Sequence, residues 1–127
     1  MSRAVYDTRF FVEFYYSKDD ETLQRMREVK RRRERFISTV VIHEVYRLTL
    51  ACEGRETAAL RATLLKQDFK VVPVTDEIAE VSAELRHRYK LSMADSMIAA
   101  TASSLKALCV SDDPHFKRIK EIKTTWI

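Results

Sequence analysis

Acidic side chains stand just after predicted strands, or in the first turns of predicted helices. They are Asp7, Glu44, Asp95 and the adjacent pair Asp112 and Asp113. In open α/β sheets, ligands bind beyond the carboxyl ends of the strands. We therefore expect these carboxylates to converge on one edge of a small sheet.

Carboxylates held a few ångströms apart repel one another, and a raised pKa or a bound cation must relieve that repulsion. Oxygen ligands suit Mg²⁺ or Mn²⁺, whereas zinc prefers cysteine and histidine. A divalent ion in such a pocket polarises a phosphoryl oxygen and generates hydroxide from water. The pattern therefore predicts an enzyme that cleaves phosphodiesters with the help of a metal.

Each acid taken singly also has a structural explanation. Asp7 and Asp113 are both candidate caps for the helices that follow them. Ser92 and Asp95 match a capping pattern, and Glu44 lies where a helix dipole favours negative charge. The prediction of a site thus rests on the acids together and not on any one of them.

Strands alternate with helices along the chain, which predicts the α/β class with a mostly parallel sheet. The predicted strands cover residues 4–6, 36–38, 70–74, 107–110 and 123–127. The predicted helices cover residues 10–16, 20–35, 39–51, 56–68, 76–89, 94–106 and 114–119. The helix at 94–106 is rich in alanine and serine, which permits close packing against a sheet.

The chain has 127 residues, and we expect one domain, 1–127. Its single glycine, Gly54, excludes the glycine-rich loops that bind nucleotides. No apolar run reaches the roughly 18 residues of a membrane helix, and charge comes too early for a signal peptide. Cys52 and Cys109 fit no metal spacing, so we expect buried thiols in a reducing compartment, the cytoplasm.

Positive charge is concentrated in one segment. The chain has a formal net charge of +4, and residues 25–35 hold seven basic residues against Glu28 and Glu34. We expect this segment to form one helix whose Arg31, Arg32 and Arg33 can contact the phosphates of RNA. The alternative is an ordinary solvated helix face.

Four segments resemble motifs of the PIN-domain ribonuclease family, and specifically of its toxin branch, VapC. They are VYDTRFF at 5–11, STVVIHEV at 38–45, MADSMIAATA at 93–102 and VSDDPHF at 110–116. Their order and spacing cover essentially the whole chain. The fairly specific features are an Asp after the first strand, an Asp opening an alanine-rich helix, and a terminal D-x-H-F.

The resemblance implies a three-layer α/β/α sandwich around a five-stranded parallel sheet and metal-dependent endonucleolytic cleavage of single-stranded RNA. Asp7, Asp95 and Asp113 would hold Mg²⁺ or Mn²⁺, and Glu44 would complete the acidic pocket as a ligand or a general base. Thr8 and Ser111 would support these ligands through hydroxyl hydrogen bonds. His115, the histidine of the D-x-H-F motif, is expected to order its loop.

Two positions depart from the family pattern or leave it open. Arg9 stands where the family commonly has a small or polar residue. Asp113 is preferred over Asp112 because family chains place a hydroxyl residue two positions before the acid, here Ser111. Asp112 stays open as the alternative.

The resemblance also implies two protein partners, a second copy of the chain in a homodimer and a VapB-like antitoxin. An RNA-processing nuclease without an antitoxin and a non-catalytic PIN-like scaffold that binds RNA or protein are the alternatives. A phospho-acceptor or phosphatase domain fits less well, because the phosphatase pattern wants D-x-D where this chain has Asp7-Thr8-Arg9.

Overall fold

The computed structural model describes residues 2–127 around a sheet of five strands that all run parallel. The strands lie side by side in the order β3-β2-β1-β4-β5. They are β1 (Arg3–Tyr6), β2 (Glu34–Ser38), β3 (Lys70–Val72), β4 (Leu108–Val110) and β5 (Lys123–Thr125). The predicted α/β class with a five-stranded sheet is therefore confirmed, and the sheet is parallel throughout.

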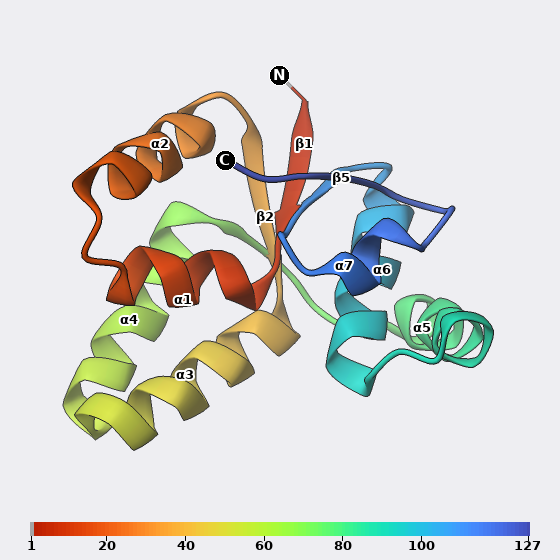
Figure 1. Ribbon diagram of the computed structural model, residues 1–127. Helices are drawn as coiled ribbons and strands as arrows, with labels where there is room; N and C mark the ends of the chain where they lie inside the picture. The colour runs from red at the N-terminus through yellow and green to blue at the C-terminus, as the bar shows by residue number, and fades with distance from the viewer. Residues whose placement is uncertain (1) are drawn as a thin grey trace.

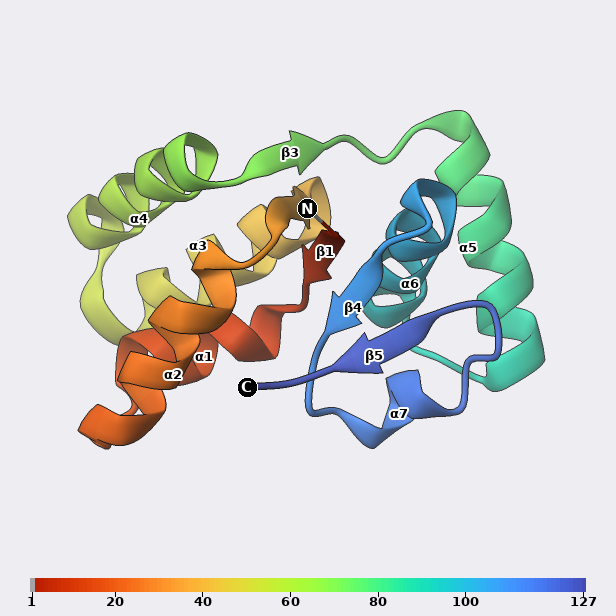
Figure 2. The same ribbon diagram turned by 90° about the horizontal axis from the view of Figure 1, so that it is seen from above.

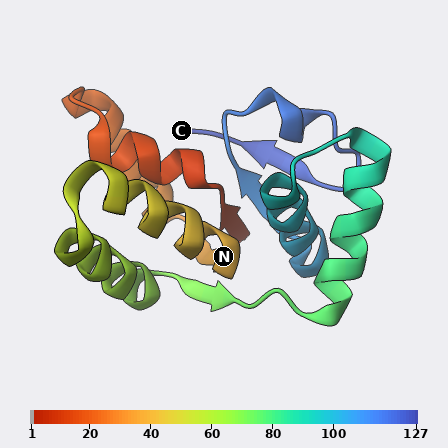
Figure 3. The same cartoon turned by 90° about the horizontal axis from the view of Figure 1, so that it is seen from below.

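Helices cover both faces of this sheet. They are α1 (Thr8–Tyr16), α2 (Asp20–Arg31), α3 (Thr39–Glu53), α4 (Arg55–Asp68), α5 (Asp76–Tyr89), α6 (Met93–Leu105) and α7 (Pro114–Lys117). Seen from below in Figure 3, α1 to α4 lie on one side of the molecule and α5 and α6 lie on the other. No helix within residues 2–127 combines the length and the apolar character needed to cross a membrane.

The parallel arrangement gives the sheet two chemically distinct edges. We call the edge at which the strands begin the amino edge, and the edge at which they end the carboxyl edge. In Figure 1, β1 and β2 run downward, and α1 and α3 begin at their lower ends. Figure 2 shows β4 and β5 side by side and pointing the same way, as their parallel pairing requires.

Side-chain caps start most of the helices directly after a strand or loop. Asp7 accepts a hydrogen bond from the Thr8 N–H, and Asp113 accepts one from the His115 N–H. Ser92 likewise caps α6 through the Asp95 N–H. The capping roles expected of these residues are confirmed, and they fix where the acids at the carboxyl edge enter their helices.

The basic segment is not one helix, which corrects the expected range 20–35. Helix α2 ends at Arg31, and Arg32 and Arg33 lie in the turn that leads to β2. The reason is the pairing of β2 with β1, because Glu34 pairs with Arg3 in the parallel register. Residues 34 and 35, which the local sequence pattern places in the helix, therefore belong to β2.

Helix α6 packs against β1 and β2 through side chains that are very small. Ala99, Ala100 and Ala102 are fully buried, and the Ser96 hydroxyl lies 2.9 Å from the Ser82 hydroxyl of α5. The expected close packing of this helix is confirmed. It places Asp95, in the first turn of α6, beside the ends of the central strands.

One of the two cysteines is not where the sequence predicts it. Cys109 is buried in β4, as expected, but Cys52 is exposed near the end of α3. The buried face of α3 follows Val41, Val45 and Thr49, and the Thr49 hydroxyl donates to the Val45 carbonyl at 2.8 Å. Position 52 therefore turns away from the core.

Replacing Ala99 by leucine tests the packing of α6. The added side chain has no room at a fully buried position, so Ala99→Leu is expected to lower the free energy of unfolding by about 1–3 kcal/mol. Ala59→Leu, at an exposed position of α4, is the matched control and is expected to change it by less than about 0.5 kcal/mol. Urea unfolding followed by circular dichroism measures both; equal effects would contradict the packing.

Candidate active site

The carboxylate of Asp7 lies in the interior, directly after β1. Asp7 is only 3% exposed. Both of its carboxylate oxygens accept hydrogen bonds. The Thr8 N–H donates to one at 2.8 Å, and the Ser111 hydroxyl donates to the other at 2.7 Å. The pKa of Asp7 is raised to about 6, because burial and the nearby charges of Asp95 and Glu44 raise it by more than these hydrogen bonds lower it.

Ser111 connects Asp7 to the next acid of the site. Its hydroxyl oxygen also accepts the Asp113 N–H at 3.1 Å. The backbone continues the connection, because the Asp7 N–H donates to the Val110 carbonyl at 3.1 Å. The loop after β4 is thereby fixed to the end of β1.

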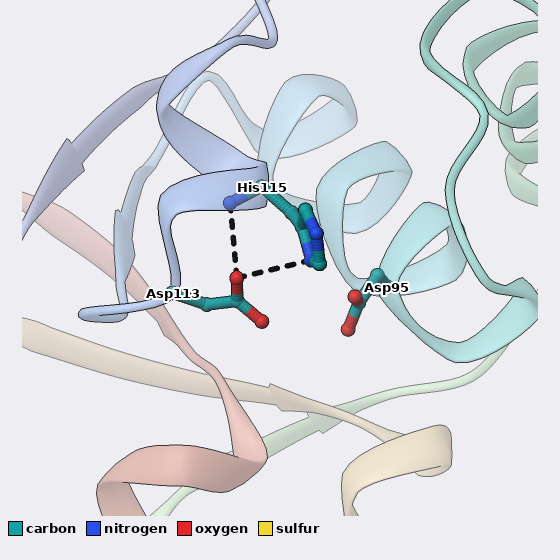
Figure 4. A group of neighbouring side chains, drawn as sticks. All are labelled: Asp95, Asp113 and His115. Carbon is teal, nitrogen blue, oxygen red and sulfur yellow. Dashed lines mark hydrogen bonds and ion pairs between the residues drawn. The ribbon is translucent and has the colours of Figure 1, made fainter.

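Asp95, Asp113 and His115 form a group of the size that holds a metal ion. One ligand atom from each lies within 4.8 Å of the others. Figure 4 shows the two carboxylates and the imidazole gathered between the start of α6 and the start of α7. Burial raises the pKa of Asp95, and the neighbouring charges of Asp113 and Glu44 raise it further.

Glu44 approaches the same region from α3. The Thr8 hydroxyl donates to its carboxylate at 2.5 Å, so Glu44 is tied to the residue that follows Asp7. Its charge acts on both Asp7 and Asp95. The structure thus brings Asp7, Glu44, Asp95 and Asp113 to one place on the carboxyl edge.

Asp112 is held apart from this group by Arg9. The Arg9 Nε donates to Asp112 at 2.5 Å and a terminal nitrogen donates to its second oxygen at 3.3 Å. This bidentate pair holds the pKa of Asp112 below its usual range. The geometry therefore supports Asp113 as the fourth acid and gives Asp112 an ion pair on the rim.

The donor set fits Mg²⁺ or Mn²⁺. Within residues 2–127, no lysine or arginine nitrogen lies within 4.0 Å of the carboxylates of Asp7, Glu44 or Asp95. Their mutual repulsion is therefore not balanced by the protein. The imidazole of His115 adds one nitrogen to the oxygen donors, which favours Mn²⁺ over the strictly oxygen-seeking Mg²⁺.

His115 is the one member of this group that the sequence assigned to a different task. It was expected to order its loop, and its ring nitrogen Nδ1 does lie 3.1 Å from Asp113. The same position also places it beside Asp95. The feature of the sequence that could have indicated this role is the position of His115 two residues after the helix cap Asp113. This spacing brings the imidazole next to the Asp113 carboxylate.

Arg31, Arg32 and Arg33 do not reach the acidic group. They precede β2 and lie at the amino edge, whereas the acids follow the strands at the carboxyl edge. The five residues of β2 separate the two edges by about 17 Å. Any contact of these arginines with RNA is therefore made away from the acids.

A hollow of about 710 Å³ opens beside the site, between α3 and α6. Thr8 and Glu44 line it together with apolar side chains such as Leu48, Met93 and Met97. Met93 is 56% exposed. The acidic group therefore borders an apolar surface.

Comparison with known proteins identifies the family and the fold of the chain. A sequence model of the PIN domain matches residues 4–122. No curated protein sequence matches the chain significantly.

Among solved structures, the DNA-bound VapBC of Salmonella typhimurium is similar at a TM-score of 0.81 and 18% identity, covering 99% of this chain and 98% of that one. VapBC2 of Rickettsia felis, bound to a promoter DNA fragment, gives 0.80 and 16%, with 97% of each chain covered. VapC20 of Mycobacterium tuberculosis, described as a toxin that cleaves the sarcin–ricin loop, gives 0.75 and 20%, with 91% and 93% covered. At these identities the likeness shows a shared fold.

Replacing Asp7 by asparagine is expected to stabilise the metal-free protein at neutral pH. The pKa of Asp7 is raised from 3.8 to about 6, so its charge destabilises the folded state as the pH rises through that window. Asp7→Asn removes the charge and keeps the hydrogen bond from Thr8. The free energy of unfolding should rise by about 1–3 kcal/mol at pH 7, and the gain should disappear below about pH 4.

Urea unfolding in EDTA at a series of pH values measures this effect. Asp76→Asn, an exposed acid at the start of α5, is the control and should show no such dependence. A gain for Asp7→Asn that is the same at pH 4 and pH 7 would contradict the electrostatic cause.

Manganese is expected to stabilise the wild-type protein, because only the folded chain assembles the ligands. Millimolar Mn²⁺ should raise the melting temperature by several degrees, and excess EDTA should reverse the shift. Asp95→Asn combined with Asp113→Asn should abolish it, while Asp76→Asn should retain it. An undiminished shift in the double variant would place the metal elsewhere.

Proposed function

Because the chain belongs to the PIN-domain family, whose members are nucleases, we propose that it is a Mg²⁺- or Mn²⁺-dependent endoribonuclease that cleaves single-stranded RNA. The observation that carries this proposal is the convergence of Asp7, Glu44, Asp95 and Asp113 at the carboxyl edge. Residues 1–127 would act as one nuclease domain in the cytoplasm. The acidic group would be its active site.

The protein contributes a binding place for the metal and fixed positions for its ligands. Asp95, Asp113 and His115 would hold the ion, with Asp7 completing the set from the end of β1. A bound divalent cation supplies charge stabilisation at the phosphoryl group and makes water reactive at neutral pH. Ser111 keeps Asp7 and the Asp113 backbone in register through its two hydrogen bonds.

Glu44 is the candidate general base. It is tied to Thr8 by a 2.5 Å hydrogen bond, which holds one oxygen in place and leaves the other to accept a proton from the attacking water. Water as the nucleophile leaves the 2′-hydroxyl of the RNA outside the reaction. The expected products therefore end in a 5′-phosphate and a 3′-hydroxyl, without a cyclic phosphate.

An antitoxin is the proposed protein partner. Leu60 and Leu64 of α4 are 58% and 50% exposed, although apolar spacing predicts that they lie inside. Leu64 helps to line a hollow of about 480 Å³ together with Phe14 and Tyr15. An apolar segment of a VapB-like antitoxin would cover this surface; a toxin–antitoxin complex from Klebsiella pneumoniae is among the solved structures of the same fold.

A homodimer is proposed on a second apolar surface. The 710 Å³ hollow between α3 and α6 presents Met93 and Leu48 next to Glu44. A second copy of the chain packed there would shield these side chains and deepen the cleft around the acids. The proposed homodimer contact is thus separate from the proposed antitoxin contact on α4.

Cleavage of RNA by the purified protein tests the proposed function. With Mn²⁺ and a mixed pool of single-stranded RNA, the wild type should produce fragments, and EDTA should stop the reaction. Asp7→Asn and Asp113→Asn should each lower the rate at least about 100-fold, because each removes a charge that the metal needs. Asp112→Asn should lower it only a few-fold, because Arg9 already neutralises this carboxylate.

Asp76→Asn is the matched control and should cleave at the wild-type rate. Sequencing of the fragment ends should find 5′-phosphates. Cleavage that survives EDTA, or products with cyclic phosphates, would contradict a reaction in which a metal activates water.

A further inference from the structure

Basic side chains form a row along the amino edge of the sheet. Each strand carries a lysine or arginine at its first residue or within the two residues before it. In sheet order these are Lys70, Arg33, Arg3, Lys106 and Lys123. Because neighbouring strands lie about 4.8 Å apart, the row extends over about 19 Å.

The acids on this edge are already occupied by ion pairs. The pairs are Glu34 with Lys70, Asp68 with Lys30 and Arg35, and Glu121 with Arg88. They therefore do little to cancel the remaining positive charges. The edge keeps a strong excess of positive charge.

Seven exposed cations on this edge have no such partner. Within residues 2–127, none of them has a carboxylate oxygen within 4.0 Å. They are Arg3, Arg31, Arg32, Lys66, Lys106, Lys120 and Lys123. Those at the ends of α2, α4 and α6 also neutralise helix dipoles. Lys120 and Lys123 stand at no end of these helices, so the dipoles do not account for them.

Two hollows open between these cations. One of about 440 Å³ is lined by Arg3, Lys106, Lys120 and Lys123, and one of about 750 Å³ by Arg33, Lys66 and Lys70 among others. The single aromatic ring lining either hollow within the described residues, Phe69, is only 5% exposed. Base stacking therefore contributes nothing there, and the surface suits a phosphate backbone.

We propose that the row of basic residues at the amino edge is a second, sequence-independent binding surface for single-stranded RNA, on the opposite edge of the sheet from the acids. The choice of RNA as the occupant rests on the proposed function. Without bound metal, the acidic carboxyl edge repels a polyanion, whereas the amino edge attracts it. The RNA is thus held on a surface that does not depend on the metal.

Two charge-reversed double variants test this surface. Lys120→Glu with Lys123→Glu changes the row, and Lys18→Glu with Arg55→Glu changes the net charge equally at exposed positions away from it. Binding of a short fluorescent oligoribonucleotide is measured by anisotropy in EDTA. The first variant should bind at least about tenfold more weakly, and its dependence of log affinity on log salt should be shallower by about 1.4. The control should stay within about threefold of wild type.

A milder variant guards against a folding defect. Lys120→Gln with Lys123→Gln should lose affinity in the same direction by a smaller factor, with an unchanged melting temperature. Equal affinities of the row variant and its control would overturn the proposal. Displacement of the RNA by polyglutamate as effectively as by unlabelled RNA would assign the surface to an acidic protein and also overturn it.

The test separates this inference from the proposed function. Binding is read in EDTA, so it needs no cleavage. A wild type that fails to cleave RNA with Mn²⁺ but binds it through the row would remove the ribonuclease assignment alone. A wild type that cleaves, with row variants that bind like the control, would remove the inference alone.

Discussion

The buried carboxylate of Asp7 is the interaction around which the site is arranged. It holds the start of α1 through Thr8 and the loop after β4 through Ser111. A carboxylate in that position is costly to desolvate, and the neighbouring charges of Asp95 and Glu44 add to the cost of its ionised form. The fold thus concentrates negative charge where it is least screened. A cation is the simplest way to relieve it.

The direction of the strands explains why charge is distributed so unevenly over the molecule. A parallel sheet sends all of its strand ends to one edge, and the acids follow those ends. The basic residues precede the strands and gather on the other edge. The formal net charge is only +4, but the carboxyl edge is negative and the amino edge is positive, and the two are separated by the length of a strand.

Much of this arrangement is predictable from sequence because it depends on order along the chain. Alternating strands and helices predict the parallel sheet. Asp7 and Glu44 come after strands, and Asp95 opens the helix that leads into β4, so their convergence at the carboxyl edge is predictable too. The end of α2 is not predictable in the same way. It depends on the pairing of Glu34 with Arg3, a contact between segments about 30 residues apart.

The outward-facing leucines and the role of His115 show a second limit. Helical spacing places Leu60 and Leu64 on an apolar face, but α4 packs through Ala58 and Leu65 and leaves them exposed. His115 comes beside Asp95 only because the turn after β4 brings two distant segments together. Spacing within one helix carries no information on which of its faces meets the sheet.

The two edge strands of the sheet are built in a way that opposes aggregation. β3 and β5 are three residues long, and each begins with a lysine. A short edge strand offers few unpaired backbone N–H and C=O groups to another chain. A lysine at its start opposes edge-to-edge pairing of the sheets of two molecules. Both β3 and β5 can therefore border the sheet without promoting fibril formation.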